Sequence, residues 1–134
     1  MPPVRQPAAF IAAALLAALG GFQVALAAGW PAAEYAWGGQ FHGALPVFYR
    51  WASLAAVPVL ALAAWVILAR ADSARPGSSA RPVRIAAWAI TGFFALSAVG
   101  NLMSASALER QIMTPLALVL LACCATVAVS KRDI

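Results

Sequence analysis

Four long apolar runs restrict what this chain can fold into. A helix needs about 20 mostly apolar residues to cross the hydrocarbon core of a bilayer, and such runs lie at 8–28, 51–69, 85–102 and 107–130. Only 10% of the residues are charged, whereas a soluble domain carries about 25%. We therefore predict an all-α fold, in which residues 1–134 form a single transmembrane domain built as a four-helix transmembrane bundle.

The fourth span depends on how the chain passes Pro115. The 16 residues that follow from this proline would measure ~24 Å as a helix, short of a hydrocarbon core of ~30 Å. Ser106 and Glu109 have the S-x-x-E spacing of a capping box, which favours a helix over 107–130 of ~36 Å. We predict this continuous helix, bent at Pro115. The alternative is a short interfacial helix that breaks at Thr114 and restarts at the proline.

The first run also has features of a cleaved signal peptide. Arg5 precedes it, and Ala25 and Ala27 form an A-x-A cleavage pattern. Its apolar core is longer than the roughly 7–15 residues of a signal. We therefore predict a helix that stays in the mature protein.

Basic residues are unequally divided between the two sides of the predicted bundle. Both termini and the 70–84 linker share one side, which carries seven of the nine basic residues, and the opposite side carries Arg50 and Arg110. Loops rich in Lys and Arg stay cytoplasmic. We predict a multi-pass protein of the bacterial plasma (inner) membrane with cytoplasmic N- and C-termini. The net charge of +5 then needs no nucleic-acid partner.

The first span has small residues at every fourth position, a pattern that lets membrane helices approach closely. We predict that this stripe packs against another helix and that Leu16 lies off it. Gln23, in the same span, is expected to form a hydrogen bond to another helix. The stripe consists of Ala9, Ala13, Ala17, Gly21, Ala25 and Gly29.

The connection between the first two spans, GWPAAEYAWGGQFHG at 29–43, gathers aromatic and polar residues. Seven of the thirteen aromatic residues lie between Trp30 and Trp51. Trp and Tyr favour the bilayer interface, so an aromatic belt accounts for much of the pattern. Exposed to water, these rings would form a large apolar surface. We predict a structured outer loop that folds over the helix ends.

Polar residues of the two outer segments form a candidate ligand-binding set, because four spans place both segments at the same end of the bundle. Structural roles are open to several members. Glu109 could cap a helix, and Arg110 could extend to lipid headgroups. Asn101 could form a hydrogen bond between two helices. An ion pair between Glu34 and Arg110 is the expected link between the segments. The set comprises Trp30, Glu34, Trp37, His42, Asn101, Ser104, Glu109 and Arg110.

Signatures of known enzymes and carriers are missing from the sequence. We find no H-E-x-x-H, G-x-S-x-G, P-loop or C-x-x-C motif, and no acidic residue in the middle of a span, where a proton-coupled carrier usually has one. Cys123 and Cys124 are adjacent in the last span and read as small apolar residues. We predict no metal site and no cofactor, leave any catalytic residue unassigned, and favour a protein that is not an enzyme.

Three short stretches, WPAAEYAWGG, NLMSASALER and the following TP, together resemble small uncharacterised bacterial four-span integral membrane proteins. The resemblance covers most of the chain. It implies the four-span fold and no particular activity.

The expected function is that of a non-catalytic multi-pass membrane protein. Its outer face would bind a small polar ligand, a lipid headgroup or a partner protein. One alternative is a small oligomeric transporter or channel, which predicts a water-filled path past Gln23. The other is an integral membrane enzyme whose outer-face acid and base are Glu34, His42 and Glu109. Expected partners are membrane lipids and a second copy of the chain or another membrane protein.

Overall fold

The computed structural model describes residues 5–72 and 74–129, which contain helices and no strand. The predicted end of the fourth span at Ser130, and the basic residues Lys131 and Arg132, lie outside the described residues. Four long helices are each apolar enough to cross a membrane, so the chain is a multi-pass membrane protein with the predicted all-α bundle. They are α1 (Arg5–Ala27), α2 (Val47–Ala71), α3 (Arg81–Leu102) and α4 (Ala107–Ala128); two short 3-10 helices, η1 (Ala33–Tyr35) and η2 (Trp37–Gly39), lie between α1 and α2.

Helix starts follow local sequence signals. Pro46 precedes α2, and Pro82 lies in the first turn of α3. A proline is tolerated at the start of a helix because the first N–H groups have no intrahelical partner. Ser106 caps α4, accepting a hydrogen bond at 3.4 Å from the backbone N–H of Glu109. α4 continues through Pro115, so the continuous fourth helix is confirmed.

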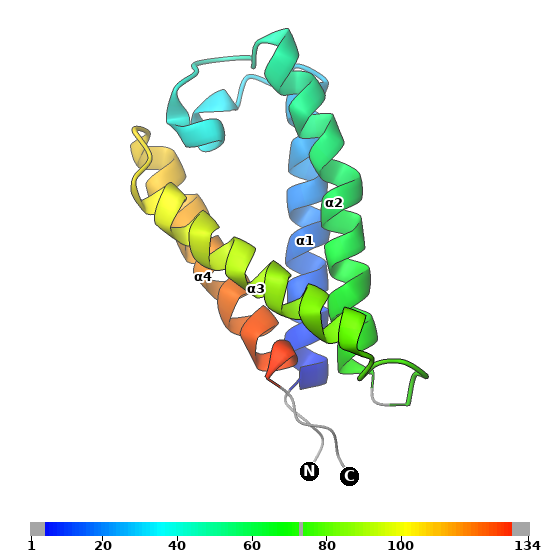
Figure 1. Ribbon diagram of the computed structural model, residues 1–134. Helices are drawn as coiled ribbons and strands as arrows, with labels where there is room; N and C mark the ends of the chain where they lie inside the picture. Colours follow the sequence, from blue (N-terminus) through cyan, green and yellow to red (C-terminus); the bar gives the residue numbers. More distant parts are fainter. Residues whose placement is uncertain (1–4, 73, 130–134) are drawn as a thin grey trace.

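The four helices form two antiparallel pairs. α1 packs along α2 and α3 packs along α4, with less extensive packing between the pairs. Figure 1 shows the pairs close together where α1 begins and α4 ends, and diverging toward the loop between α1 and α2. We call these two ends of the bundle the terminal end and the loop end.

Two apolar clusters hold this arrangement. The larger joins all four helices, and its fully buried members include Leu16, Ile67, Leu120, Cys124 and Val127. The smaller lies under the loop and contains Leu26, Ala32, Ala33, Ala36 and Leu45. The second cluster packs the loop against the end of α1, so the predicted structured loop is confirmed.

The small-residue stripe predicted on α1 is only in part a packing face: its member Ala9 is 1% exposed, but none of its other members is buried. Gly21 and Ala17 are exposed, and a Cβ added at Gly21 would meet no atom within 4 Å. Leu16, predicted to lie off the packing face, is only 1% exposed. Alanine is so frequent in α1 that small residues occur on every side of it, and the position of α2 and α4 decides which side is buried.

Candidate functional site

The α1–α2 loop crosses the loop end and touches the α3–α4 connection. Figure 1 shows η1 and η2 between the separated ends of the two helix pairs. The backbone N–H of Ala105 donates a hydrogen bond to the carbonyl oxygen of Gly38 at 3.2 Å. The two outer segments therefore meet, as predicted, but through backbone atoms instead of charged side chains.

Gly39 makes this contact close enough to exclude a side chain. A Cβ at this position would lie 2.6 Å from the backbone nitrogen of Ser106 and 2.9 Å from the hydroxyl of Ser104. Its φ of +69° is also in the region that glycine adopts most readily. The Gly-Gly pair thus allows the loop to dock on the start of α4.

Trp37 fastens the same loop to α2. Its indole Nε1–H donates to the hydroxyl of Ser53 at 3.1 Å, and its ring meets Tyr49 edge-on at 5.3 Å. Trp37 has a φ of 55°, a conformation that costs of order 1–3 kcal/mol in a residue other than glycine. The hydrogen bond and ring contact hold the residue in this conformation.

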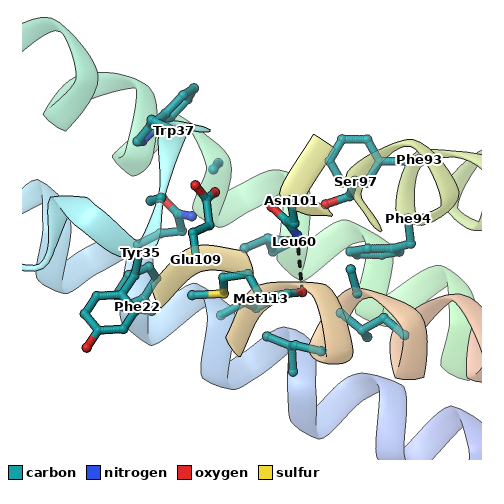
Figure 2. A pocket seen from close by; sticks show the side chains of 17 residues that line it. Phe22, Tyr35, Trp37, Leu60, Phe93, Phe94, Ser97, Asn101, Glu109 and Met113 are labelled. Carbon is teal, nitrogen blue, oxygen red and sulfur yellow. Dashed lines mark hydrogen bonds between the residues drawn. The ribbon is translucent and has the colours of Figure 1, made fainter. Parts of the chain in front are cut away.

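A cavity of about 270 Å³ lies below the docked loop, between the two helix pairs. All four long helices and residues 35–37 contribute to its lining, as Figure 2 shows. Most of its wall is apolar. The apolar lining includes Phe22, Leu60, Phe94, Met113, Leu116 and Leu120.

Polar side chains line the part of the cavity nearest the loop. Glu109 is only 4% exposed, and its Oε2 accepts a hydrogen bond from the Ser104 hydroxyl at 2.5 Å. Asn101 donates from Nδ2 to the carbonyl oxygen of Met113 at 3.2 Å, which joins α3 to α4 as predicted (Figure 2). Ser97 lies one turn below Asn101 on α3.

Gln23 brings a further polar group to the cavity from α1. Its Oε1 is buried and has no hydrogen-bond partner within residues 5–72 and 74–129. The hydrogen bond to another helix that we expected from the sequence is therefore not formed by this oxygen. A buried acceptor without a donor costs free energy. The oxygen itself is enclosed by protein atoms, although the Gln23 side chain lines the cavity.

Two residues of the cavity lining are exposed, Trp37 in the loop and Phe93 on α3. Phe93, at its edge, is 58% exposed. This residue lies nine positions before Leu102, the last residue of α3, which is about 14 Å along the helix. At that depth the surroundings of a membrane-spanning helix are hydrocarbon, so the exposed part of Phe93 would lie against lipid.

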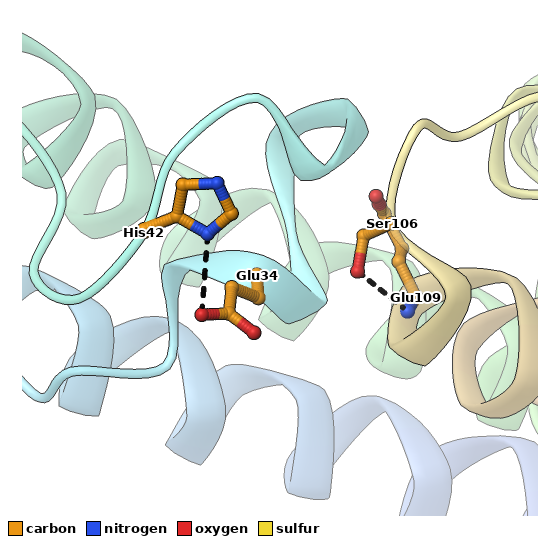
Figure 3. A network of polar contacts seen from close by, with 4 residues as sticks. All are labelled: Glu34, His42, Ser106 and Glu109. Carbon is orange, nitrogen blue, oxygen red and sulfur yellow. Dashed lines mark hydrogen bonds and ion pairs between the residues drawn. The ribbon is translucent and has the colours of Figure 1, made fainter.

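Glu34 and His42 lie apart from the cavity. His42 Nδ1 and Glu34 Oε1 are 3.3 Å apart, and the two side chains are 85% and 41% exposed, respectively. Figure 3 shows this pair separate from Ser106 and Glu109. The predicted contact between Glu34 and Arg110 is wrong, because Arg110 donates from Nη1 to the carbonyl oxygen of Ser104 at 2.6 Å.

The eight predicted site residues thus fall into two groups. Trp37, Asn101 and Glu109 line the cavity, and Ser104 supports Glu109. The others lie outside the lining: Trp30, Glu34, His42 and Arg110. Sequence reasoning missed Ser97, although its spacing of four residues from Asn101 places both on one face of α3.

Searches for relatives and for metal ligands add no further assignment. Comparison with protein-family models, with curated proteins and with solved structures finds no match to this chain. Within the described residues, no group of three or more His, Cys, Asp or Glu side chains is arranged to hold a metal ion. The cavity with its polar end is therefore the candidate functional site of this protein.

Proposed function

We propose that this protein binds a membrane-dissolved amphipathic molecule in the cavity between its two helix pairs, without catalysing a reaction. The observation that carries the proposal is the lining of the cavity, which is polar near the loop and apolar toward the centre of the bundle. Binding pockets for small molecules typically combine an apolar wall with a few well-placed polar groups.

The length of the cavity fits a molecule with a polar head and an apolar chain. Glu109 and Leu120 mark its two ends on α4 and are 11 residues apart, or about 17 Å along the helix. The head would lie beside Glu109 and Asn101, and the chain would extend toward Leu120. The molecule would enter from the bilayer past Phe93, which lines the cavity and is exposed.

The geometry favours binding over the two other functions that the sequence left open. Leu16, Ile67 and Val127 are fully buried in the cluster that joins the helices toward the terminal end, which argues against a continuous water path. Glu34 and His42 do not converge with Glu109 on one pocket, which argues against the acid–base set.

The charge distribution supports an orientation for this site. We infer that the terminal end is cytoplasmic and that the loop end faces the outside of a bacterial inner membrane, because seven of the nine basic residues fall on the terminal side. The polar head of the bound molecule would then lie in the outer leaflet.

Photo-crosslinking tests the proposal directly. The full-length protein, in nanodiscs, is incubated with a long-chain alkyl alcohol carrying a diazirine, irradiated and digested for mass spectrometry. We expect saturable labelling at Leu60, Phe94 and Met113, which line the cavity and are not exposed to lipid, with protection by excess unlabelled alcohol. Unsaturable labelling spread equally over lipid-facing residues such as Leu62 and Leu96 would contradict the proposal.

A matched pair of variants checks that the cavity itself is responsible. Ala117 is buried in the cavity wall and Ala122 is exposed on the same helix. Ala117→Phe should fill the space and abolish saturable labelling, whereas Ala122→Phe should leave it unchanged. Melting temperatures of both variants, measured alongside, separate loss of binding from loss of folding.

A further inference from the structure

We infer that the cavity selects an amphiphile with a cationic head that carries several N–H groups, such as an alkylammonium, over one with a neutral or anionic head. This inference rests on the proposed function and specifies the chemical class of its ligand. It depends chiefly on the Glu109 carboxyl group and, in second place, on the Gln23 amide; the two side chains line the cavity from opposite helix pairs.

Glu109 supplies a carboxyl group that is buried and lacks a cationic partner. The Ser104 hydroxyl donates to Oε2, and no ion pair to Glu109 is present in the part of the chain that the structure describes. A buried carboxylate is stabilised strongly by an opposite charge, because attraction is screened less inside a protein than in water. A cationic head in the cavity would provide that charge.

The basic residues at the loop end are engaged elsewhere. Arg110 donates from Nη1 to the carbonyl oxygen of Ser104, and Arg50 donates from Nε to the carbonyl oxygen of Ala27 at 3.0 Å. Neither side chain lines the cavity. An anionic head would thus meet a carboxyl group in a cavity that no guanidinium lines, which disfavours an alkyl sulfate or a fatty acid.

Gln23 distinguishes an ammonium head from a hydroxyl head. Its buried Oε1 has no donor in the described structure, and the Glu109 carboxyl group also accepts hydrogen bonds. An alcohol has one O–H to donate, whereas a primary ammonium has three N–H donors. The ammonium therefore has donors to spare for the Glu109 carboxyl group and for the Gln23 amide, and it carries the charge opposite to that of a carboxylate.

Competition against the photoreactive alcohol tests this selectivity. Decylammonium, decanol and decyl sulfate are compared as competitors with the full-length protein in a neutral detergent. We expect decylammonium to halve the labelling at a concentration at least about tenfold lower than decanol does, a difference of about 1.4 kcal/mol. Decyl sulfate should be the weakest competitor of the three.

Three variants assign the selectivity to the cavity. Glu109→Gln keeps the size of the side chain and one acceptor oxygen for the Ser104 hydroxyl but removes the ionisable carboxyl group, and should bring decylammonium to the level of decanol. Gln23→Leu should narrow the difference between the two compounds. Glu34→Gln removes an exposed carboxylate at the same end of the bundle and should change nothing, which controls for general attraction of cations to this surface.

Each remaining outcome has a definite meaning. Equal competition by decylammonium and decanol, or the strongest competition by decyl sulfate, would overturn the inference while leaving the proposed function in place. If the alcohol itself gives no saturable labelling, the proposed function fails. Should Glu109→Gln lower the melting temperature too far for assay, Gln23→Leu decides, since unchanged selectivity in that variant would count against the inference.

Discussion

Gly38 and Gly39 are neighbours with the same unusual backbone and different surroundings. Their φ angles are +76° and +69°, so a side chain at either position would adopt a strained conformation. A Cβ at Gly38 would meet no atom within 4 Å, whereas one at Gly39 would press against Ser106 and Ser104. Gly38 is thus needed only for its backbone conformation, whereas Gly39 is needed both for its conformation and for the close contact with the start of α4.

Substitution of each glycine by alanine should therefore have unequal effects. Gly38→Ala should lower the free energy of unfolding by about 1–2 kcal/mol, the cost of a left-handed conformation. Gly39→Ala should lower it clearly further, because the new methyl group also displaces the start of α4. Thermal unfolding in detergent measures both, and equal losses would show that the contact with Ser106 contributes little to stability.

Among the helices, α1 shows most clearly that burial does not follow residue size. The exposed side of α1 includes Ala17 and Gly21, and its buried side includes Ala9, Ala12 and Leu16. Membrane helices associate largely through close packing. The stability of the bundle should therefore depend on the side chains that fill the space between α1 and its neighbours.

Two substitutions on α1 test which face packs. Leu16→Ala removes a side chain from the main cluster and should lower the free energy of unfolding by roughly 2 kcal/mol or more. Gly21→Leu adds a side chain where the structure leaves open space, and should change it by no more than about 0.5 kcal/mol. If Gly21→Leu proves the more damaging in a melting assay, the small-residue stripe is the packing face after all.

For the whole molecule, the divergence of the helix pairs determines where a cavity with polar side chains can form. The pairs are packed together toward the terminal end and separated toward the loop end, where the loop closes over the space between them (Figure 1). A buried carboxyl group, an amide oxygen and an apolar wall therefore meet in one cavity. Because the cavity lies toward the loop end, the proposed orientation would place it in the outer half of the membrane.

Reporter fusions test this orientation. An enzyme active only in the periplasm should be silent when fused after Ile134 and active when fused after Gly43, in the loop between α1 and α2. The expected pattern follows from the excess of basic residues on the terminal side. Activity at Ile134 and silence at Gly43 would reverse the orientation and place the cavity in the cytoplasmic leaflet.

The sequence alone was enough to predict the four spans, the start of α4 at its Ser106 cap and the folding of the aromatic loop. These features depend on local composition and on residues within a few positions of one another, such as the spacing of Ser106 and Glu109.

Only the tertiary structure decided that Glu109 faces the cavity while Glu34 pairs with the exposed His42, and that Leu16 is buried while Gly21 is not. These outcomes depend on the rotation of each helix and on the separation of the pairs. The rotation and the separation are fixed by contacts between residues distant in the sequence, such as Trp37 with Ser53 and Gly39 with Ser106. The sequence does not show which residues will form such contacts.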